Sequence, residues 1–186
     1  GPITDLQPGC AAKLPFKNTK ITGILTFADL LALVTGRVPL FVEIKSEWTE
    51  PDLRFLSEIA RLATAYKGPI ALMSFDPGVM AVLARLAPDI PRGIVSGRYR
   101  DASGAPWWPE LSSWRMFRLR HLLEHQGAAP DFYAYEVGAL PTLATHLART
   151  IRGLPLLAWT VRTDHDRRIA AMHADAPIFE GYDPKS

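Results

Sequence analysis

The stretch VPLFVEIKS, Val38 to Ser46, joins a hydrophobic run to two opposite charges. Its apolar and β-branched residues predict a buried strand over Val38–Ile44. Side chains two positions apart in a strand point to the same face, so Glu43 and Lys45 should share a face with Phe41. An unpaired charge is costly to bury. The pair therefore belongs either to a solvated strand end or to a site that holds a metal or an anion.

Five further short apolar runs follow the first one along the chain. Runs of this kind, without strict alternation, are typical of parallel strands that are covered on both faces. The complete set of predicted strands is Val38–Ile44, Pro69–Met73, Gly93–Ser96, Asp131–Val137, Leu154–Val161 and Pro177–Glu180.

Helix-start signals separate these strands. A Thr followed three residues later by Asp has the spacing of a capping box, and an Asp-Pro pair fits an N-cap followed by the first helical residue. The predicted starts are Thr26 with Asp29, Thr49 with Asp52, Asp76 with Pro77, Pro141, and Thr163 with Asp166.

Alternating strands and helices predict a parallel sheet with right-handed crossovers. Two architectures compete, an open doubly wound sheet and a closed eight-stranded barrel. Six strands are too few for a barrel, which usually takes about 250 residues. However, the chain has no glycine-rich strand-to-helix turn of the dinucleotide-binding type, which counts against the commonest use of the open sheet.

The composition describes one globular domain over residues 1–186, with 48% hydrophobic residues and a formal net charge of +2. This balance gives no sign of a nucleic-acid partner or of a polybasic membrane anchor. No apolar run approaches the roughly 20 residues that span a bilayer. The single cysteine, Cys10, excludes an internal disulfide framework and fits a reducing compartment, so we expect a cytoplasmic protein. The use of Ala, Arg and Pro suggests a bacterial source.

Two other strand ends carry candidate site residues. Ser74 and Phe75 follow the second strand, and Trp159 interrupts an otherwise aliphatic strand. Active sites of barrels and doubly wound sheets gather at the carboxyl ends of the strands. The loop Gly97–Leu111, with Trp107 and Trp108, leaves a strand at that end, and its aromatic residues would either cover the site or simply pack onto the barrel.

Three segments together carry a resemblance to a known family. VPLFVEIKS, GPIALMSFDPGVMAVLARLAPDIPRGIV and LPLLAWTVRTDHDRRIAAMHADAPIFEGYDP occur in this order between Thr22 and Pro184. They resemble the later portion of the glycerophosphodiester phosphodiesterase family. The resemblance implies a TIM-type (β/α) barrel, a divalent metal (Mg²⁺ or Ca²⁺), and hydrolysis of glycerophosphodiesters to glycerol 3-phosphate and an alcohol.

The resemblance also implies roles for individual residues. Glu43 would ligate the metal, and Lys45 would be the catalytic cation that neutralises the phosphate. Trp159 would form a wall of the substrate pocket, with Ser74 and Phe75 as further substrate contacts. These roles agree with the preference of hard divalent cations for carboxylate oxygens and with the use of a metal and an ammonium group to stabilise a phosphodiester transition state.

Several motifs of the family do not occur in the chain. These are the His-Arg-Gly of its first strand, the Glu-x-Asp of its second and a following His-Asp. His165-Asp166 has the right letters but opens a helix, where we expect Asp166 to act as a cap, and His121 and His125 fit a helix surface better than a metal site. We therefore expect an incomplete barrel that lacks its first two strands, with residues 1–25 as a connector and a missing N-terminal barrel segment as partner. Such a chain should be inactive alone.

Two other interpretations remain open. The chain could be a non-catalytic, barrel-derived module that binds phosphate or another ligand. It could also be an unrelated α/β domain in which Glu43 and Lys45 form only an ion pair.

Overall fold

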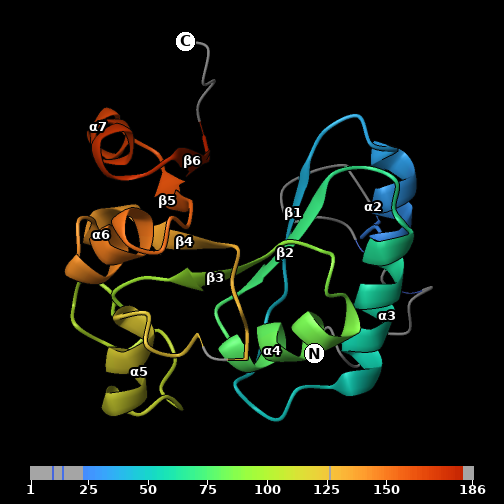
Figure 1. The fold of residues 1–186 in the computed structure, drawn as a ribbon, viewed down its shortest axis with the longest axis horizontal. Helices are drawn as coiled ribbons and strands as arrows, with labels where there is room; N and C mark the ends of the chain where they lie inside the picture. The colour runs from blue at the N-terminus through green and yellow to red at the C-terminus, as the bar shows by residue number, and fades with distance from the viewer. Residues whose placement is uncertain (1–9, 11–13, 15–22, 126, 182–186) are drawn as a thin grey trace.

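The computed structural model describes residues 10, 14, 23–125 and 127–181. Six parallel strands form one sheet in the sequential order β1-β2-β3-β4-β5-β6, and the sheet curls into a half-barrel with helices on its outside (Figure 1). The strands are β1 Leu40–Glu43, β2 Ile70–Ser74, β3 Arg92–Ser96, β4 Phe132–Glu136, β5 Leu156–Val161 and β6 Ala176–Phe179. Each overlaps a strand predicted from the sequence.

Helices connect these strands. They are α2 Phe27–Val34, α3 Leu53–Ala65, α4 Pro77–Leu86, α5 Ser113–Arg120, the 3₁₀ helix η2 Val137–Ala139, α6 Leu143–Thr150 and α7 Asp164–His173. The predicted connector, residues 1–25, lies outside the described residues except for positions 10, 14 and 23–25.

Most predicted helix starts are confirmed. Thr26 and Thr163 form capping boxes with Asp29 and Asp166, and Asp76 caps α4 with a proline in its first turn. The prediction for Thr49 was wrong. Asp52 is itself the N-cap of α3 and accepts hydrogen bonds from two backbone N–H groups, a role that an aspartate takes as readily as a threonine.

The start of α6 also differs from the prediction at Pro141. The N-cap is Thr142, whose hydroxyl accepts from the backbone N–H of Thr145, and Pro141 precedes the cap. A threonine that can accept this bond stabilises a helix end better than a proline placed at the same position.

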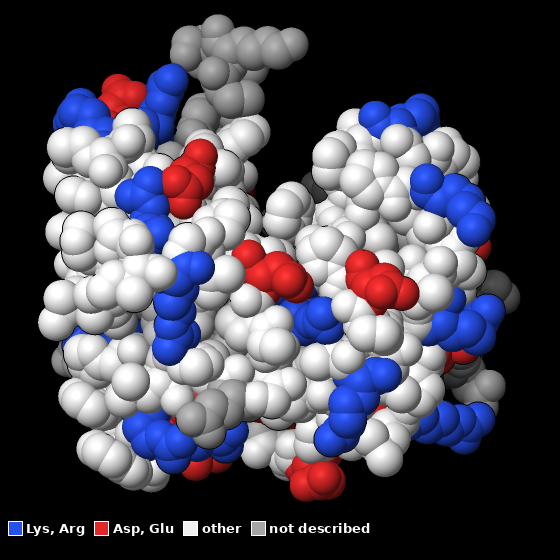
Figure 2. Space-filling model, in the orientation of Figure 1, with Lys and Arg blue, Asp and Glu red and all other residues white. Residues whose placement is uncertain are grey.

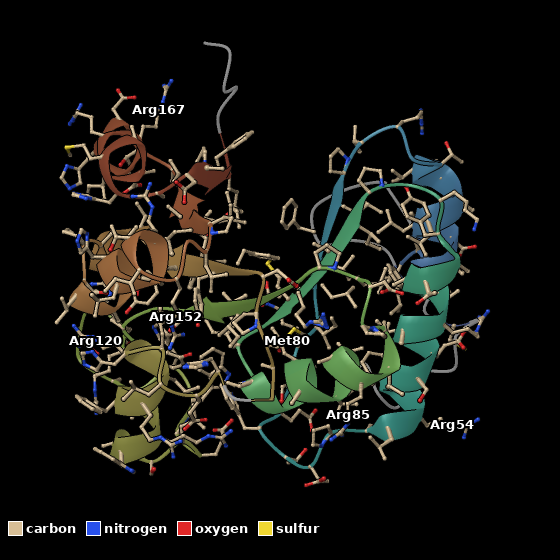
Figure 3. All side chains as sticks on the ribbon, in the orientation of Figure 1. Arg54, Met80, Arg85, Arg120, Arg152 and Arg167 are labelled. Atoms are coloured by element: carbon tan, nitrogen blue, oxygen red, sulfur yellow. The ribbon has the colours of Figure 1, made fainter. Side chains whose placement is uncertain are left out.

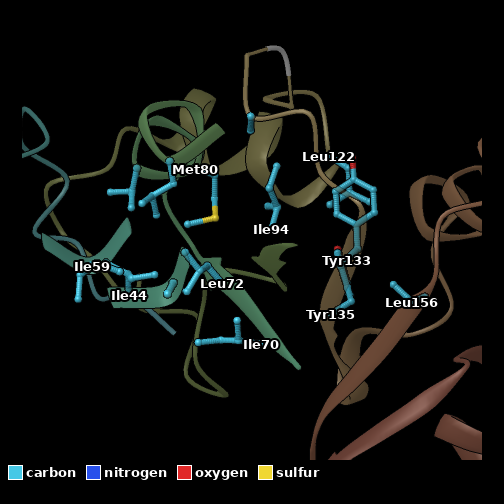
Figure 4. Packing of buried hydrophobic residues seen from close by; sticks show 14 of the residues in the cluster. Ile44, Ile59, Ile70, Leu72, Met80, Ile94, Leu122, Tyr133, Tyr135 and Leu156 are labelled. Atoms are coloured by element: carbon cyan, nitrogen blue, oxygen red, sulfur yellow. The ribbon is translucent and has the colours of Figure 1, made fainter. Parts of the chain in front are cut away.

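The main core lies between the sheet and the helices. Alternate strand residues, among them Ile44, Leu72 and Ile94, are almost fully buried there. Figure 4 shows these side chains gathered near Met80 of α4, with Tyr133 and Tyr135 farther along the sheet. Burial of apolar surface contributes about 25 cal/mol per Å², so this layer is the chief source of stability.

The residues that alternate with these core residues along the strands face the inside of the half-barrel. A smaller cluster there contains Ala71, Met73, Val95, Phe132 and Ala134. Phe41 of β1 makes an edge-to-face contact with Phe132 of β4 across the sheet, with ring centroids 5.6 Å apart. This contact joins strands that are not neighbours, so it shows that Phe41, and with it Glu43, faces inward.

The sequential strand order and the curl decide between the two predicted architectures. A doubly wound sheet reverses its strand order at a switch point and carries helices on both faces, whereas this sheet does neither. The fold is therefore of the barrel type. Within the described residues β1 and β6 each pair on one side only, and Figure 2 shows a notch between the part that contains β6 and α7 and the part that contains β1 and α2.

Candidate active site

Glu43 and Lys45 stand together at the carboxyl end of β1. The Lys45 Nζ donates to the Glu43 Oε1 at 2.5 Å. The Glu43 side chain is 27% exposed and that of Lys45 is 81% exposed. The pair is thus on the inner face, as the sequence predicts, with the carboxylate partly shielded and the ammonium open to solvent. An ammonium in this position is free to meet an anion.

Hydrogen bonds around Ser74 and Asp76 fix the chain that follows β1. The Ser74 hydroxyl, at the end of β2, donates to the Ile44 carbonyl at 2.7 Å and accepts from the Asp76 N–H at 3.1 Å. The Ser46 hydroxyl donates to the Asp76 carboxylate at 2.6 Å. Residues on both sides of Lys45 are therefore held by the turn after β2.

This network gives Ser74 a different place from the one expected for a substrate contact. The residue is completely buried, and it faces the helices together with Ile70 and Leu72. Alternation along β2 then turns Phe75 toward the inside of the half-barrel. The structure therefore brings Phe75, Trp159, Glu43 and Lys45 to the inner face and places Ser74 behind it.

Phe75 is the centre of an aromatic cluster at the carboxyl ends of the strands. Its ring centroid lies 5.0 Å from Trp108 and 5.4 Å from Trp159, and it also contacts Tyr99 and Trp107 at 6.3 Å. These tilted and edge-to-face contacts are favourable for aromatic pairs. Burial raises the pKa of Tyr99, so its phenol stays protonated.

Trp159 is fixed across two strand ends. Its indole Nε1 donates to the Ser96 carbonyl at 3.2 Å and to the Ala134 carbonyl at 3.1 Å. The peptide bond from Trp159 to Thr160 is cis. The ring therefore spans β3 and β4 from β5 and has a fixed orientation in the wall of the half-barrel.

The loop Gly97–Leu111 packs onto this wall. Trp107 lies 5.9 Å from Trp159, its N–H donates to the Tyr99 carbonyl, and both tryptophans of the loop are partly buried. Trp108 makes a further edge contact with Trp48 at 5.3 Å. Of the two predicted alternatives, covering the site or packing onto the barrel, the structure shows the loop packed onto the barrel wall, where it adds aromatic surface to the mouth.

A second ion pair at the mouth was not predicted from the sequence. Glu136, the last residue of β4, accepts from the Arg98 N–H at 2.9 Å and from the Arg98 Nε at 2.7 Å. The hydrogen bond that Arg98 donates to the Glu136 carboxylate raises the pKa of Arg98. A Cβ on Gly97 would come within 2.8 Å of the Glu136 Cβ, so a glycine at this position allows the contact. In the sequence, the only signal for this pair was the place of Glu136 at the end of a predicted strand, on the same face as Phe132 and Ala134.

The described residues do not form a complete metal site. No group of three His, Cys, Asp or Glu residues in this part of the chain is close enough to hold an ion. Glu43 is one carboxylate, whereas Ca²⁺ takes six to eight oxygen ligands and Mg²⁺ takes six. His121 makes a tilted ring contact with Phe117, and the His125 Nε2 lies 2.7 Å from the Arg152 Nη2. The prediction that both lie on a helix was wrong, because α5 ends at Arg120, with His121 as its C-cap and His125 beyond it.

Comparisons with known proteins agree with the resemblance seen in the sequence. No family model and no curated protein matches the chain, but solved structures do. An Oleispira antarctica phosphodiesterase in complex with the product sn-glycerol-3-phosphate is similar with a TM-score of 0.59 at 16% identity, over 84% of this chain and 57% of its own. A glycerophosphodiester phosphodiesterase from Parabacteroides distasonis has a TM-score of 0.58 at 17% identity, and the match covers 95% of this chain and 68% of that protein. A candidate member of the same enzyme class from Galdieria sulphuraria has a TM-score of 0.67 at 15% identity, and the match covers 95% of this chain and 67% of that protein.

At these identities the likeness establishes the fold, which is that of glycerophosphodiester phosphodiesterases. The chain spans between 57% and 68% of the length of these three neighbours.

Proposed function

We propose that the chain is the C-terminal part of a metal-dependent hydrolase that cleaves glycerophosphodiesters to glycerol 3-phosphate and an alcohol. One observation carries the proposal. A carboxylate and an exposed ammonium stand together on the inner face of a barrel-type sheet, at the carboxyl ends of the strands and on the same face as a wall of aromatic rings. Sites of barrel enzymes are built at this end.

In this proposal Lys45 binds the phosphate. Its ammonium is open to solvent and is held on one side by Glu43. A phosphodiester oxygen would approach from the other side and gain a charge-assisted hydrogen bond that strengthens as charge develops in the transition state. Phe75 and Trp159 offer apolar ring surface to the carbon skeleton of the substrate.

Ser74 acts through position rather than contact. Its hydroxyl holds the Ile44 carbonyl, between Glu43 and Lys45, and so fixes the spacing of the two charges. We therefore treat Ser74 as a positioning residue for the pair.

Glu43 would supply one ligand to Mg²⁺ or Ca²⁺. A bound divalent ion would polarise the phosphoryl oxygen and offset its charge. Because the described residues gather no group of three possible ligands, and the Glu136 carboxylate is paired with Arg98, the other ligands and the general acid and base would come from another segment. The free edge of β1 and the notch beside it suit two further strands that would close the barrel.

The test is a hydrolysis assay with glycerophosphocholine and added Mg²⁺ or Ca²⁺. The 186-residue chain alone should release no glycerol 3-phosphate, whereas a polypeptide extended by the preceding gene segment should release it in a metal-dependent way. In that extended protein, Lys45→Met should lower kcat/KM by about 10² or more. Metal-dependent turnover by the short chain would refute the assignment of the missing groups.

A second candidate function is a phosphate-binding module without catalysis. The observation behind it is the Lys45 ammonium, which is 81% exposed beside Glu43 and offers a cation to an anionic ligand. An extended protein that binds sn-glycerol 3-phosphate in a calorimeter, loses this binding on Lys45→Met, and still hydrolyses nothing would favour the module over the enzyme.

A further inference from the structure

A stacked aromatic pair lies on the surface of α5, on the outside of the half-barrel. The rings of Trp114 and Phe117 are 5.4 Å apart and only 10° from parallel. Trp114 is 66% exposed and Phe117 is 46% exposed. The His121 ring lies beside this pair, 4.3 Å from that of Phe117 and tilted by 49°. Large rings left in solvent on one helix face mark an interaction surface more often than isolated exposed residues do.

A groove continues this surface from α5 to α6. It has a volume of about 250 Å³, and its lining includes His121, Leu123, Leu147, Ile151 and Arg152. Ile151 is 76% exposed, and Leu123 and Leu147 are also exposed. His121 contacts Phe117 and also lines the groove, so it joins the aromatic pair to the aliphatic groove. We call the resulting surface the α5–α6 patch.

The two segments that form the α5–α6 patch carry basic residues and no acidic ones. The segments 111–123 and 141–154 contain five arginines and no aspartate or glutamate, although the whole chain carries 21 basic and 19 acidic residues. The arginines are Arg115, Arg118, Arg120, Arg149 and Arg152. Figure 3 shows Arg120 and Arg152 on the side of the molecule where α5 and α6 lie.

Part of this charge is compensated within the protein. Glu124 pairs with Arg115 at 3.4 Å and with Arg118 at 3.6 Å, and Asp175 pairs with Arg149 at 2.6 Å. Arg120 is exposed at the end of α5, and Arg152 contacts only uncharged groups, the Tyr133 hydroxyl and His125. A net positive rim therefore remains beside the apolar patch.

We propose that the α5–α6 patch docks the protein onto the surface of an anionic lipid bilayer. Tryptophan and phenylalanine beside arginine are the composition of elements that lie in the membrane interface, where the rings enter the headgroup region and the guanidinium groups meet lipid phosphates. None of the described helices is long and apolar enough to cross a bilayer.

The position of the patch supports this occupant. The end of α5 lies against β3 and β4, where the Ser96 and Tyr135 hydroxyls donate to the Leu119 and Arg120 carbonyls, and α6 packs on β5. Within the described residues the edge strands of the sheet are β1 and β6. Strands that close the barrel would pair at those edges and leave the patch uncovered. The charge then distinguishes the partners, because lipid phosphates complement arginines and a second copy of the same basic patch would repel them.

The experiment is co-sedimentation of the chain with vesicles of phosphatidylcholine, alone or with about 30% phosphatidylglycerol. We expect binding to the mixed vesicles only, weakened by added salt. Trp114→Ala with Phe117→Ala should lower the partition coefficient about tenfold or more, because two rings no longer enter the interface. Arg120→Gln with Arg152→Gln should remove most of the preference for anionic lipid.

The matched control is Phe55→Ala on α3. The exposed fraction of Phe55, 50%, is similar to the 46% of Phe117, but Phe55 lies on α3, outside the patch. Its loss should therefore leave vesicle binding unchanged. Circular dichroism checks that each variant keeps its fold. Absence of wild-type binding to mixed vesicles overturns the proposal. So does equal loss in the control, or a concentration-dependent dimer that the Trp114 and Phe117 changes dissociate, since the patch would then join two copies.

Discussion

Asp76→Ala tests how the turn after β2 supports the candidate site. Asp76 is buried, with 3% of the residue exposed. Its carboxylate caps α4 by accepting a hydrogen bond from the Gly78 N–H at 2.9 Å, and it also accepts one from the Ser46 hydroxyl at 2.6 Å. Loss of an N-cap costs about 1 kcal/mol. The partly buried Ser46 hydroxyl would lose its acceptor, which adds roughly 1 kcal/mol. The variant should therefore lose about 2 kcal/mol of the free energy of unfolding.

Asp52→Ala is the matched control for this change. Asp52 also caps a helix, with hydrogen bonds from the Arg54 and Phe55 N–H groups, but its side chain is exposed and reaches no other element. Its loss should cost only about 1 kcal/mol. Urea unfolding, followed by circular dichroism and by tryptophan fluorescence, measures both values.

A double-mutant cycle isolates the contact that holds the strand end. Ser46→Ala and Asp76→Ala should show a coupling energy of about 1 kcal/mol or more, because the two side chains share a hydrogen bond. Equal destabilisation by Asp76→Ala and Asp52→Ala, together with a coupling energy near zero, would refute the reasoning that this turn fixes Lys45.

Three further changes probe other parts of the structure. Trp159→Phe removes both carbonyl hydrogen bonds of the indole and should destabilise the fold by about 1–3 kcal/mol in urea unfolding; no change would mean that the indole N–H does not hold the ring. Gly97→Ala places a methyl group 2.8 Å from the Glu136 Cβ and should cost roughly 1–3 kcal/mol by the same assay; wild-type stability would show that the mouth is looser than described. A hydrogen bond from Arg149 lowers the pKa of Asp175, so this aspartate contributes stability above its unfolded pKa, and the contribution is lost as pH falls through the lower folded pKa. Asp175→Asn should therefore flatten the fall in unfolding free energy between about pH 5 and pH 2, measured by urea titrations at each pH, and an unchanged slope would contradict it.

The fold could be predicted because its signals are local. Short apolar runs, an Asp-Pro pair and Thr-x-x-Asp spacings each act within one turn or one strand, and six strands were found where the sequence placed them. The two exceptions, at Thr49 and Pro141, have local causes as well, since Asp52 and Thr142 cap their helices instead. What the sequence alone left open was the curl of the sheet, which depends on contacts such as Phe41 with Phe132 between distant strands.

The candidate site was predictable in part. Alternation along β1 placed Glu43 and Lys45 on one face, and the structure brings them together on that face. Ser74 was harder to place, because a shift of one position along a strand moves a side chain from the inside of the half-barrel to the helix layer. In the structure its hydroxyl donates a hydrogen bond to the Ile44 carbonyl. The Arg98–Glu136 pair joins residues 38 positions apart, and no local pattern announces such a contact.

The central claim is that Glu43 belongs to the working site of a phosphodiesterase. Its most direct test is the rate of glycerol 3-phosphate release from glycerophosphocholine, in the presence of Mg²⁺ or Ca²⁺, by the N-terminally extended protein and by its Glu43→Gln variant. We predict that the variant loses at least about 10²-fold in kcat/KM, the usual effect of removing a group that stabilises transition-state charge. A Glu43→Gln protein as active as the parent would contradict the account.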